Sequence, residues 1–276
     1  EIPEGSRTSK GRAIQNLINI EQDDCVKAFI CTQDLKDEEY VNGHYVIMAT
    51  KKGIVKKTSL EQYSRPRQNG INAITVRDGD ELLEAKLTTG TSEIFLGLKS
   101  GKAIRFEESK TRPMGRNASG VRGITLANEE DEVIGMVSVH NFEDEILVVS
   151  EKGYGKRSSI EDYRVTNRGG KGVKTISVTE KTGGLVAIKN VTDSDDLMII
   201  NKSGIAIRMS VEDLRVMGRA TQGVRLINIK GNDSIAAVAK VMKEEDDLEE
   251  SEILDIEVDT ENGTEIDTDE SDVSEE

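Results

Sequence analysis

The chain has 276 residues, of which 36% are hydrophobic, enough for one large β domain or two ordinary domains. No apolar run approaches membrane-spanning length and no secretory leader is recognisable, so we expect no membrane partner. The two cysteines, Cys25 and Cys31, are too few for a disulfide framework and indicate a reduced, cytoplasmic protein.

The net charge of -15 is distributed very unevenly. Residues 244–276 contain 18 Asp or Glu and no Lys or Arg, whereas residues 1–243 contain 37 basic and 34 acidic residues. The acidic stretch has too little apolar content to offset chain entropy, so we expect a folded, mildly basic domain at 1–243 and a disordered tail at 244–276. The tail either competes with a polyanion for the basic domain or only solubilises the chain.

In chain order, the first predicted elements are strands at 13–20 and 25–31, preceded by Gly11, which form half of a repeating unit. Four complete units follow, because glycines recur in two series with one period of about 50 residues. The hairpin series has spacings of 48, 52 and 51, and the second series has spacings of 50, 52 and 51. The hairpin glycines are Gly53, Gly101, Gly153 and Gly204, and the second glycines are Gly70, Gly120, Gly172 and Gly223.

Alternating apolar and β-branched residues predict four strands in each complete unit. First strands are expected at 45–50, 94–98, 146–150 and 197–201, and second strands at 54–58, 103–106, 154–158 and 205–209. Third strands are expected at 70–76, 120–126, 172–178 and 223–229, and fourth strands at 81–87, 132–139, 184–191 and 234–241. Half a unit and four units of short strands indicate an all-β, propeller-like array of about five blades, with two packed β-sandwiches as the alternative.

Cations recur in phase with these units. One lies four residues after each hairpin glycine, and another lies four residues before most of the second glycines, with Arg65 and Arg67 flanking that position in the first complete unit. Any single one of these residues is more simply a solubilising group or a guard of a strand edge. The phased set instead predicts a continuous basic track for a long polyanion.

The loop at 167–172 contains three glycines together with Arg168 and Lys171, more glycine than one turn requires. Backbone amides and cations can approach an anion together in such a loop, so it is a candidate phosphate site. The DNA-contacting residues that we predict are Lys10, Arg12, Lys57, Arg67, Arg105, Arg116, Lys156, Arg157, Arg168, Gly169, Gly170, Lys171, Gly172, Arg208 and Arg219.

Residues 1 to about 243 resemble a β-pinwheel, the C-terminal DNA-wrapping domain of the gyrase A subunit in bacterial DNA gyrase. The most specific segments are GIVKKTSLEQY (53–63), GKAIRFEESKTRPMGRNASGVRGI (101–124), GYGKRSSIEDY (153–163) and MGRATQGVRLI (217–227). The family's glycine-rich box ends in Arg-Gly-Gly-Lys-Gly, which occurs here at 168–172 after Thr166 and Asn167 rather than after Gln and a basic residue. Either the principal box precedes Glu1 or the Arg168 loop has taken its role.

The resemblance implies a non-catalytic domain that bends and wraps double-stranded DNA on its rim. Its expected partners are DNA, the catalytic core of the gyrase A subunit, and the gyrase B subunit, in the bacterial cytoplasm at the nucleoid. ATP and magnesium would be used elsewhere in the holoenzyme, so this chain needs no cofactor. No catalytic constellation, P-loop or metal cluster is apparent, and the 3% aromatic content argues against base stacking. The alternatives are the equivalent domain of topoisomerase IV and a propeller scaffold for protein partners.

Overall fold

The computed structural model describes residues 6, 9–11, 13–18, 20–21, 24–67, 69–141, 143–229, 231 and 233–242. The predicted tail at 244–276 lies outside the described residues. The strands are β1 (Tyr45–Thr50), β2 (Ile54–Ser59), β3 (Leu82–Thr88), β4 (Glu93–Leu98), β5 (Lys102–Glu107), β6 (Val121–Arg122), β7 (Val133–Val139), β8 (Glu145–Ser150), β9 (Tyr154–Ser159), β10 (Val173–Lys174), β11 (Leu185–Val191), β12 (Asp195–Asn201), β13 (Ala206–Ser210), β14 (Val224–Arg225) and β15 (Ile235–Met242). The helices are α1 (Glu38–Gly43) and the 3-10 turns η1 (Ile14–Asn16), η2 (Leu60–Tyr63), η3 (Glu108–Lys110) and η4 (Ile160–Asp162).

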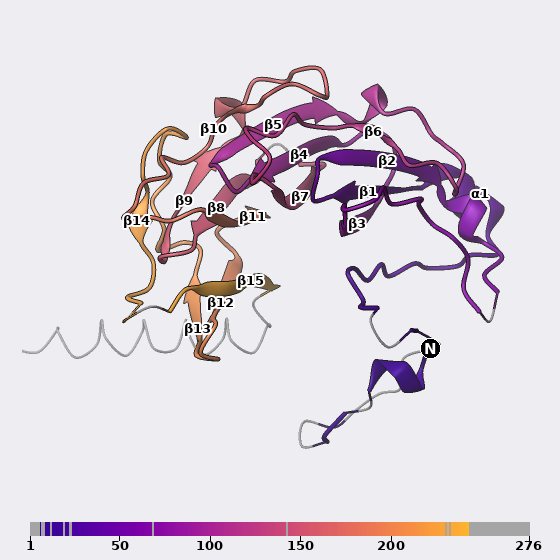
Figure 1. Ribbon diagram of the computed structural model, residues 1–276, viewed down its shortest axis with the longest axis horizontal. Helices are drawn as coiled ribbons and strands as arrows, with labels where there is room; N and C mark the ends of the chain where they lie inside the picture. Colours follow the sequence, from indigo (N-terminus) through magenta and orange to yellow (C-terminus); the bar gives the residue numbers. More distant parts are fainter. Residues whose placement is uncertain are drawn as a thin grey trace, which may run out of the picture.

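Four antiparallel sheets, the blades, follow one another along an arc (Figure 1). Their strand orders are β3-β1-β2-β6, β10-β5-β4-β7, β11-β8-β9-β14 and β13-β12-β15. The predicted first, second and fourth strands of every unit are confirmed within one or two residues, and all glycines of both series have positive φ. The all-β, blade-like architecture is therefore as the sequence predicts.

The third strands differ from the prediction in length and in partner. β6, β10 and β14 have two residues each, and each pairs with the hairpin of the preceding unit rather than with its own. After β6 the regular strand pairing ends, because the next two backbone amides share one acceptor in the hairpin turn. Gly123 N and Ile124 N donate to Gly53 O at 2.8 and 3.2 Å. Each of the first three blades therefore takes its outer strand from the unit that follows it.

Among the described residues, the first unit lacks its predicted third strand, and the segment before it lacks both of its predicted strands. Residues 70–76 form no strand, residues 14–16 form the 3-10 turn η1, and residues 25–31 run without strand pairing. In the other units the third segment pairs with the hairpin of the preceding unit, and the described residues contain no hairpin of a unit before the first. Ile30 instead packs on the apolar cluster of the first blade.

We call β6, β10 and β14 the swapped strands, because each pairs with the preceding unit. Glycine is required where each swapped strand begins. Gly120 has φ +91°, and a Cβ there would lie 2.5 Å from Val55 O. Gly172 and Gly223 repeat this contact, with a Cβ at 2.6 Å from Ala103 O and at 2.5 Å from Gly155 O. Backbone packs on backbone at these points, so the obstacle is not a flexible side chain that could move.

The core lies between consecutive blades, which explains the continuous apolar runs of the first strands. Ile94, Leu96 and Leu98 of β4 face the first blade, while Phe95 faces the third. Both faces of an inner sheet are therefore buried. In the fourth blade, which has no outer strand among the described residues, Ile205 beside β13 is 58% exposed.

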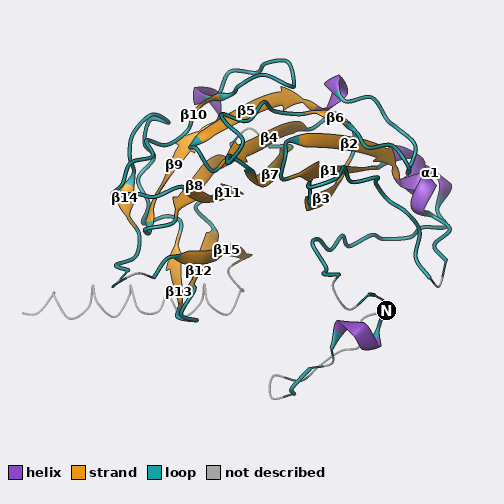
Figure 2. Cartoon of the chain, viewed as in Figure 1, coloured by secondary structure: helices purple, strands orange, loops and turns teal. Residues whose placement is uncertain are grey.

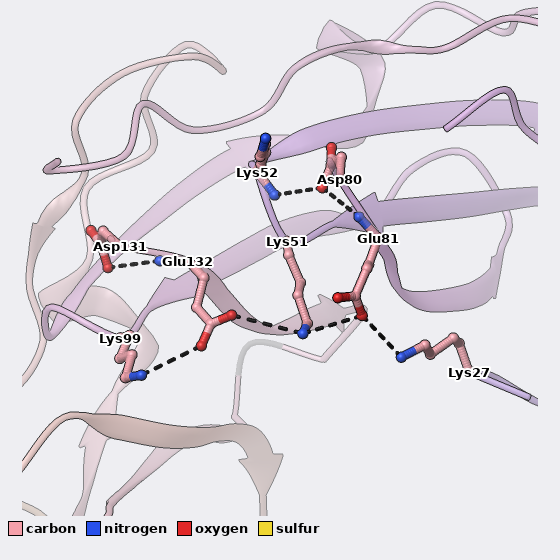
Figure 3. A network of polar contacts seen from close by, with 8 residues as sticks. All are labelled: Lys27, Lys51, Lys52, Asp80, Glu81, Lys99, Asp131 and Glu132. Carbon is pink, nitrogen blue, oxygen red and sulfur yellow. Dashed lines mark hydrogen bonds and ion pairs between the residues drawn. The ribbon is translucent and has the colours of Figure 1, made fainter. Parts of the chain in front are cut away.

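A Lys–Glu network joins the first two blades on the side of the inner strands (Figure 3). Lys51 Nζ lies 3.2 Å from Glu81 Oε2 and 3.9 Å from Glu132 Oε2, and Lys99 Nζ lies 3.6 Å from Glu132 Oε1. Lys27 and Lys51 hold the pKa of Glu81 below its usual range by hydrogen bonding. Backbone bonds accompany the network: Val133 N donates to Lys51 O and Leu185 N to Lys99 O, at 2.8 and 2.9 Å.

The cations that follow the hairpin glycines by four residues link the blades internally. Lys57 Nζ lies 2.8 Å from Glu108 Oε1 of the next unit. Arg105 Nε lies 2.5 Å from Glu93 Oε2, and its Nη1 donates at 2.8 Å to the carbonyls of Ile160 and Tyr163 in the next unit.

The third blade repeats this arrangement. Arg157 pairs with Glu145 at 3.0 Å and with Asp193, and it donates to Leu214 O of the fourth unit. The predicted rim position of Lys57, Arg105 and Arg157 is therefore wrong, because these side chains are buried. These cations recur once per unit because, in each of the first three blades, the cation at this position binds the unit that follows.

Replacing Gly120 by alanine should lower the free energy of unfolding by about 1–3 kcal/mol, because the backbone conformation and the contact with Val55 O both exclude a Cβ. Gly115→Ala in the same loop is the matched control, since a Cβ there meets nothing within 4 Å. Urea unfolding of both variants measures the difference. Equal midpoints for the two variants would contradict the close packing described for Gly120.

Lys57→Met should cost about 3–5 kcal/mol of unfolding free energy, because it leaves the fully buried Glu108 carboxylate without its counter-charge. Lys51→Met is the control and should cost less than about 1 kcal/mol, since the pairs of Lys51 are partly exposed. Urea denaturation at pH 7 compares them. A Lys57 variant no less stable than the Lys51 variant would show that the buried pair does not stabilise the junction.

Candidate nucleic-acid interface

Four segments form the outer edge of the arc, and they contain no acidic residue. This rim comprises residues 63–77, 111–126, 163–178 and 214–229, which include the loops outside β6, β10 and β14 (Figure 2). The cations of the rim are Arg65, Arg67, Arg77, Arg112, Arg116, Arg122, Arg164, Arg168, Lys171, Lys174, Arg215, Arg219 and Arg225. Because cations crowd here without carboxylates, the rim is strongly positive although the whole chain is acidic.

Consecutive rim segments are joined to one another by equivalent backbone hydrogen bonds. Thr75 N donates to Ala118 O at 3.3 Å, and Thr125 N donates to Gly170 O at 2.9 Å. Ser177 N donates to Thr221 O at 3.0 Å in the same way. The rim is therefore one connected surface that crosses three blade junctions.

Two loop arginines lie beside cations of the preceding swapped strand. Arg168 Nη1 donates to Arg122 O at 3.0 Å and its Nε to Lys110 O at 2.9 Å. Arg219 Nη1 donates to Lys174 O at 2.8 Å, the equivalent contact one blade later. Both guanidinium groups are held by carbonyl oxygens, which orient them without neutralising their charge.

Ion pairing distinguishes the rim from the Lys–Glu network and from the buried cations Lys57, Arg105 and Arg157. The lysines of that network and these three buried cations all face carboxylates. Among the residues that the structure describes, no rim cation forms an ion pair within 4.0 Å. Unpaired cations grouped on one edge are what binding of an extended polyanion requires.

The glycine-rich loop 168–172 packs tightly on the second blade. Gly169 N donates to Gly123 O at 2.5 Å, while Thr125 Oγ1 donates to Gly169 O at 2.7 Å. The amide of Gly169 is therefore engaged, whereas Gly170 and Lys171 are exposed. Phosphate binding by this loop stays a prediction, and Lys171 offers it the most accessible charge.

The structure divides the predicted contact residues into distinct groups. On the rim, Arg67 and Lys171 are exposed, and Arg116, Arg168 and Arg219 are half-buried. Lys156 is fully buried, as Lys57, Arg105 and Arg157 nearly are, so its predicted exposure is also wrong. Arg208 of β13 is exposed and pairs with Asp196 at 2.6 Å. Lys10 is exposed in the segment before the first blade, and Arg12 lies outside the described residues.

Two further series of rim cations were not predicted. Arg112, Arg164 and Arg215 lie eight residues before a second glycine, and all three are exposed. Arg122, Lys174 and Arg225 lie two residues after it and are also exposed. Counting from the second glycines at these two offsets finds both series in the sequence, whereas counting from the hairpin glycines leads to the buried set.

Arg225 also borders a cavity of about 510 Å³ between the third and fourth units. Its Nη2 donates at 3.0 Å to the phenol oxygen of Tyr154, and this bond lowers the pKa of Tyr154. The described residues contain no group of three His, Cys, Asp or Glu that could hold a metal ion. No helix in the described part of the chain is long and apolar enough to cross a bilayer.

Comparison with known proteins agrees with this architecture. A family model described as "DNA gyrase C-terminal domain, beta-propeller" matches residues 44–89, 99–140, 144–192 and 195–242, one match for each blade. The chain is 46% identical over 253 residues to the DNA gyrase A subunit of Staphylococcus aureus strain MRSA252, covering 91% of this chain and 28% of that protein. The corresponding protein from strain NCTC 8325 / PS 47 is also 46% identical, over 254 residues and with the same coverage.

Two solved structures share the fold. The C-terminal domain of DNA topoisomerase IV superposes with a TM-score of 0.78 at 24% identity, covering 90% of this chain and 75% of that one. The DNA gyrase A C-terminal domain superposes with a TM-score of 0.74 at 24% identity, covering 85% and 76%. The chain spans only 28% of the length of the curated relatives it matches. With a swapped-strand array of blades and a match of the family model to each blade, the chain belongs to the DNA gyrase C-terminal domain family.

Proposed function

We propose that the rim binds double-stranded DNA along its phosphate backbone and bends it around the arc. The single observation that supports this most is the acid-free rim, whose cations are unpaired among the described residues and continue across every blade junction. A duplex needs such a distributed surface, because each phosphate contact is weak alone and the contacts must follow the curve of the backbone.

Bending energy supports many small contacts rather than one strong site. Bending 20–30 base pairs by 40–90° costs about 1–6 kcal/mol, so a longer wrap costs several times that amount. Contacts repeated on each blade can offset this cost, and they carry no base information. We therefore expect binding that is steeply salt-dependent and nearly independent of sequence.

The relatives are DNA gyrase A subunits, and this chain corresponds to about a quarter of their length. We therefore propose that it works as the wrapping domain of a type II topoisomerase and presents a bent duplex to the catalytic core of the gyrase A subunit, with the gyrase B subunit in the same complex. In this proposal the catalytic residues, ATP and magnesium belong to other parts of the holoenzyme. The domain itself contributes DNA geometry and no bond chemistry.

Two other functions can be told apart from this one. The similarity to a topoisomerase IV domain is compatible with a role in either DNA gyrase or topoisomerase IV. The supercoils trapped in circular DNA would distinguish gyrase-type wrapping from the other mode. A protein-binding propeller would not need cations repeated along the rim. Competition by plain duplex DNA, and loss of that competition with added salt, would exclude the scaffold function.

Replacing Arg112, Arg164 and Arg215 by glutamine in one triple variant should weaken duplex binding by the same factor for DNA duplexes of unrelated base sequence. The plot of log K against log salt has a negative slope, and its magnitude should decrease by about 0.9 for each phosphate that is no longer neutralised, or about 2.7 in total. Fluorescence anisotropy over a salt series measures both effects. Lys99→Gln in the Lys–Glu network is the control and should leave the slope unchanged. An unaltered slope in the triple variant would remove the rim from the DNA interface.

Ligation of nicked circular DNA in the presence of the chain should trap positive supercoils once the protein is removed. The expected writhe follows from wrapping of gyrase type, whereas straight binding leaves relaxed circles. Two-dimensional agarose gels report the sign and number of supercoils. The Arg112, Arg164 and Arg215 triple variant at the same concentration should trap fewer. Relaxed circles at saturating protein would rule out gyrase-type wrapping and favour the alternative functions.

A further inference from the structure

Two buried lysines have no role in the proposed DNA contact itself. Lys56 of β2 and Lys156 of β9 both lie three residues after a hairpin glycine, and both are 0% exposed. Lys56 Nζ donates at 2.5 Å to Arg116 O and also to Ala73 O. Lys156 Nζ donates at 2.6 Å to Gly218 O and at 3.1 Å to Thr221 Oγ1. Each amine therefore reaches from one blade into the rim loop of the next.

Neither ammonium group forms an ion pair with a described residue. Burial lowers the pKa of Lys56 to about 8, and the nearby Arg116 adds to this effect. Burial likewise lowers the pKa of Lys156 to about 8; Asp162 opposes the shift, and Arg219 and Lys174 add to it. The Tyr63 phenol also donates to Ala73 O, at 3.2 Å, beside the Lys56 amine. A buried cation without a carboxylate is costly, and here the two ammonium groups donate hydrogen bonds to backbone carbonyl oxygens and, from Lys156, to one hydroxyl oxygen.

The second blade supports the rim loop of the following unit without a buried lysine. Ile104 occupies the equivalent position, and its Cδ1 lies 3.5 Å from where a Cβ on Gly170 would be. The glycine-rich loop therefore rests directly on an apolar side chain. The loops that carry Arg116 and Arg219 rest on ammonium groups instead.

The geometry points to Lys56 and Lys156 as positioning residues for DNA binding: their ammonium groups hold the rim loops in the shape that presents Arg116 and Arg219 to the duplex backbone. This role depends on the proposed function, because the orientation of these arginines matters only if the rim binds DNA. Lys56 and Lys156 themselves contact no DNA.

A double-mutant cycle on the 276-residue chain tests this role. Lys156→Met and Arg219→Gln should each weaken duplex affinity about fivefold, and the double variant should be little weaker than either one, because the arginine is already misplaced without the lysine. Arg168→Gln provides the matched control, since its loop rests on Ile104. Combined with Lys156→Met, its effect should multiply to about 25-fold. A purely long-range charge effect of Lys156 would multiply in both cycles.

The pH profile gives an independent reading. Because the folded pKa of both lysines is about 8, the ammonium form is present at pH 7 and is lost as pH rises through 8. Duplex affinity of the unmodified chain should therefore fall by about fivefold or more between pH 7 and 9 as the charge-assisted bonds weaken. The Lys56→Met/Lys156→Met variant should show no such fall.

The outcomes separate this role from the proposed function. Multiplicative effects in the Lys156–Arg219 cycle, or a flat pH profile for the unmodified chain, would overturn the positioning role while salt-dependent DNA binding remained. Absence of salt-dependent duplex binding by the unmodified chain would instead overturn the proposed function. If Lys156→Met fails to fold by circular dichroism, the Arg116→Gln/Arg219→Gln variant decides: positioning requires that it lose the fall between pH 7 and 9.

Discussion

The second, third and fourth units each transfer a two-residue strand to the blade before them, and this is the constraint on which the rest of the structure depends. It places Gly120, Gly172 and Gly223 against backbone carbonyls of the preceding hairpin, where no side chain fits. It also carries a cation, Arg122, Lys174 or Arg225, to the outer edge at the same place in each of the first three blades. Fold and rim charge therefore follow from one repeated contact.

Each junction is secured at three depths. Near the inner strands, Val133 N and Leu185 N donate to hairpin carbonyls of the preceding blade. At mid-depth, the buried cations Lys57, Arg105 and Arg157 bind the following unit. At the rim, loop carbonyls accept hydrogen bonds from the segment before them. Lys57, Arg105 and Arg157 face carboxylates, whereas the rim cations have no counter-charge among the described residues.

The sequence predicted the blades well, because strand alternation and glycine spacing are local signals. It could not show that the third segment pairs with another unit, since Val121 and Arg122 read as a strand whichever hairpin they join. The location of some cations was predicted wrongly for a related reason. Lys57 and Arg116 both recur in phase with the units, and only burial distinguishes a junction residue from a surface residue. The partner of Lys57, Glu108, lies 51 positions away, and nothing in the spacing connects them.

Among the described residues, the fourth sheet has no fourth strand at its outer edge, and this gives the array a polarity. Each of the first three sheets takes its outer strand from the unit after it, so completion of a sheet depends on its neighbour in one direction only, although the apolar core of an inner blade contacts both neighbours. Such a chain behaves as a one-dimensional series of nearest-neighbour couplings. The amides of β13 should then exchange with solvent sooner than those of β2, β5 and β9, and loosening that begins there would pass backwards along the chain, one blade at a time.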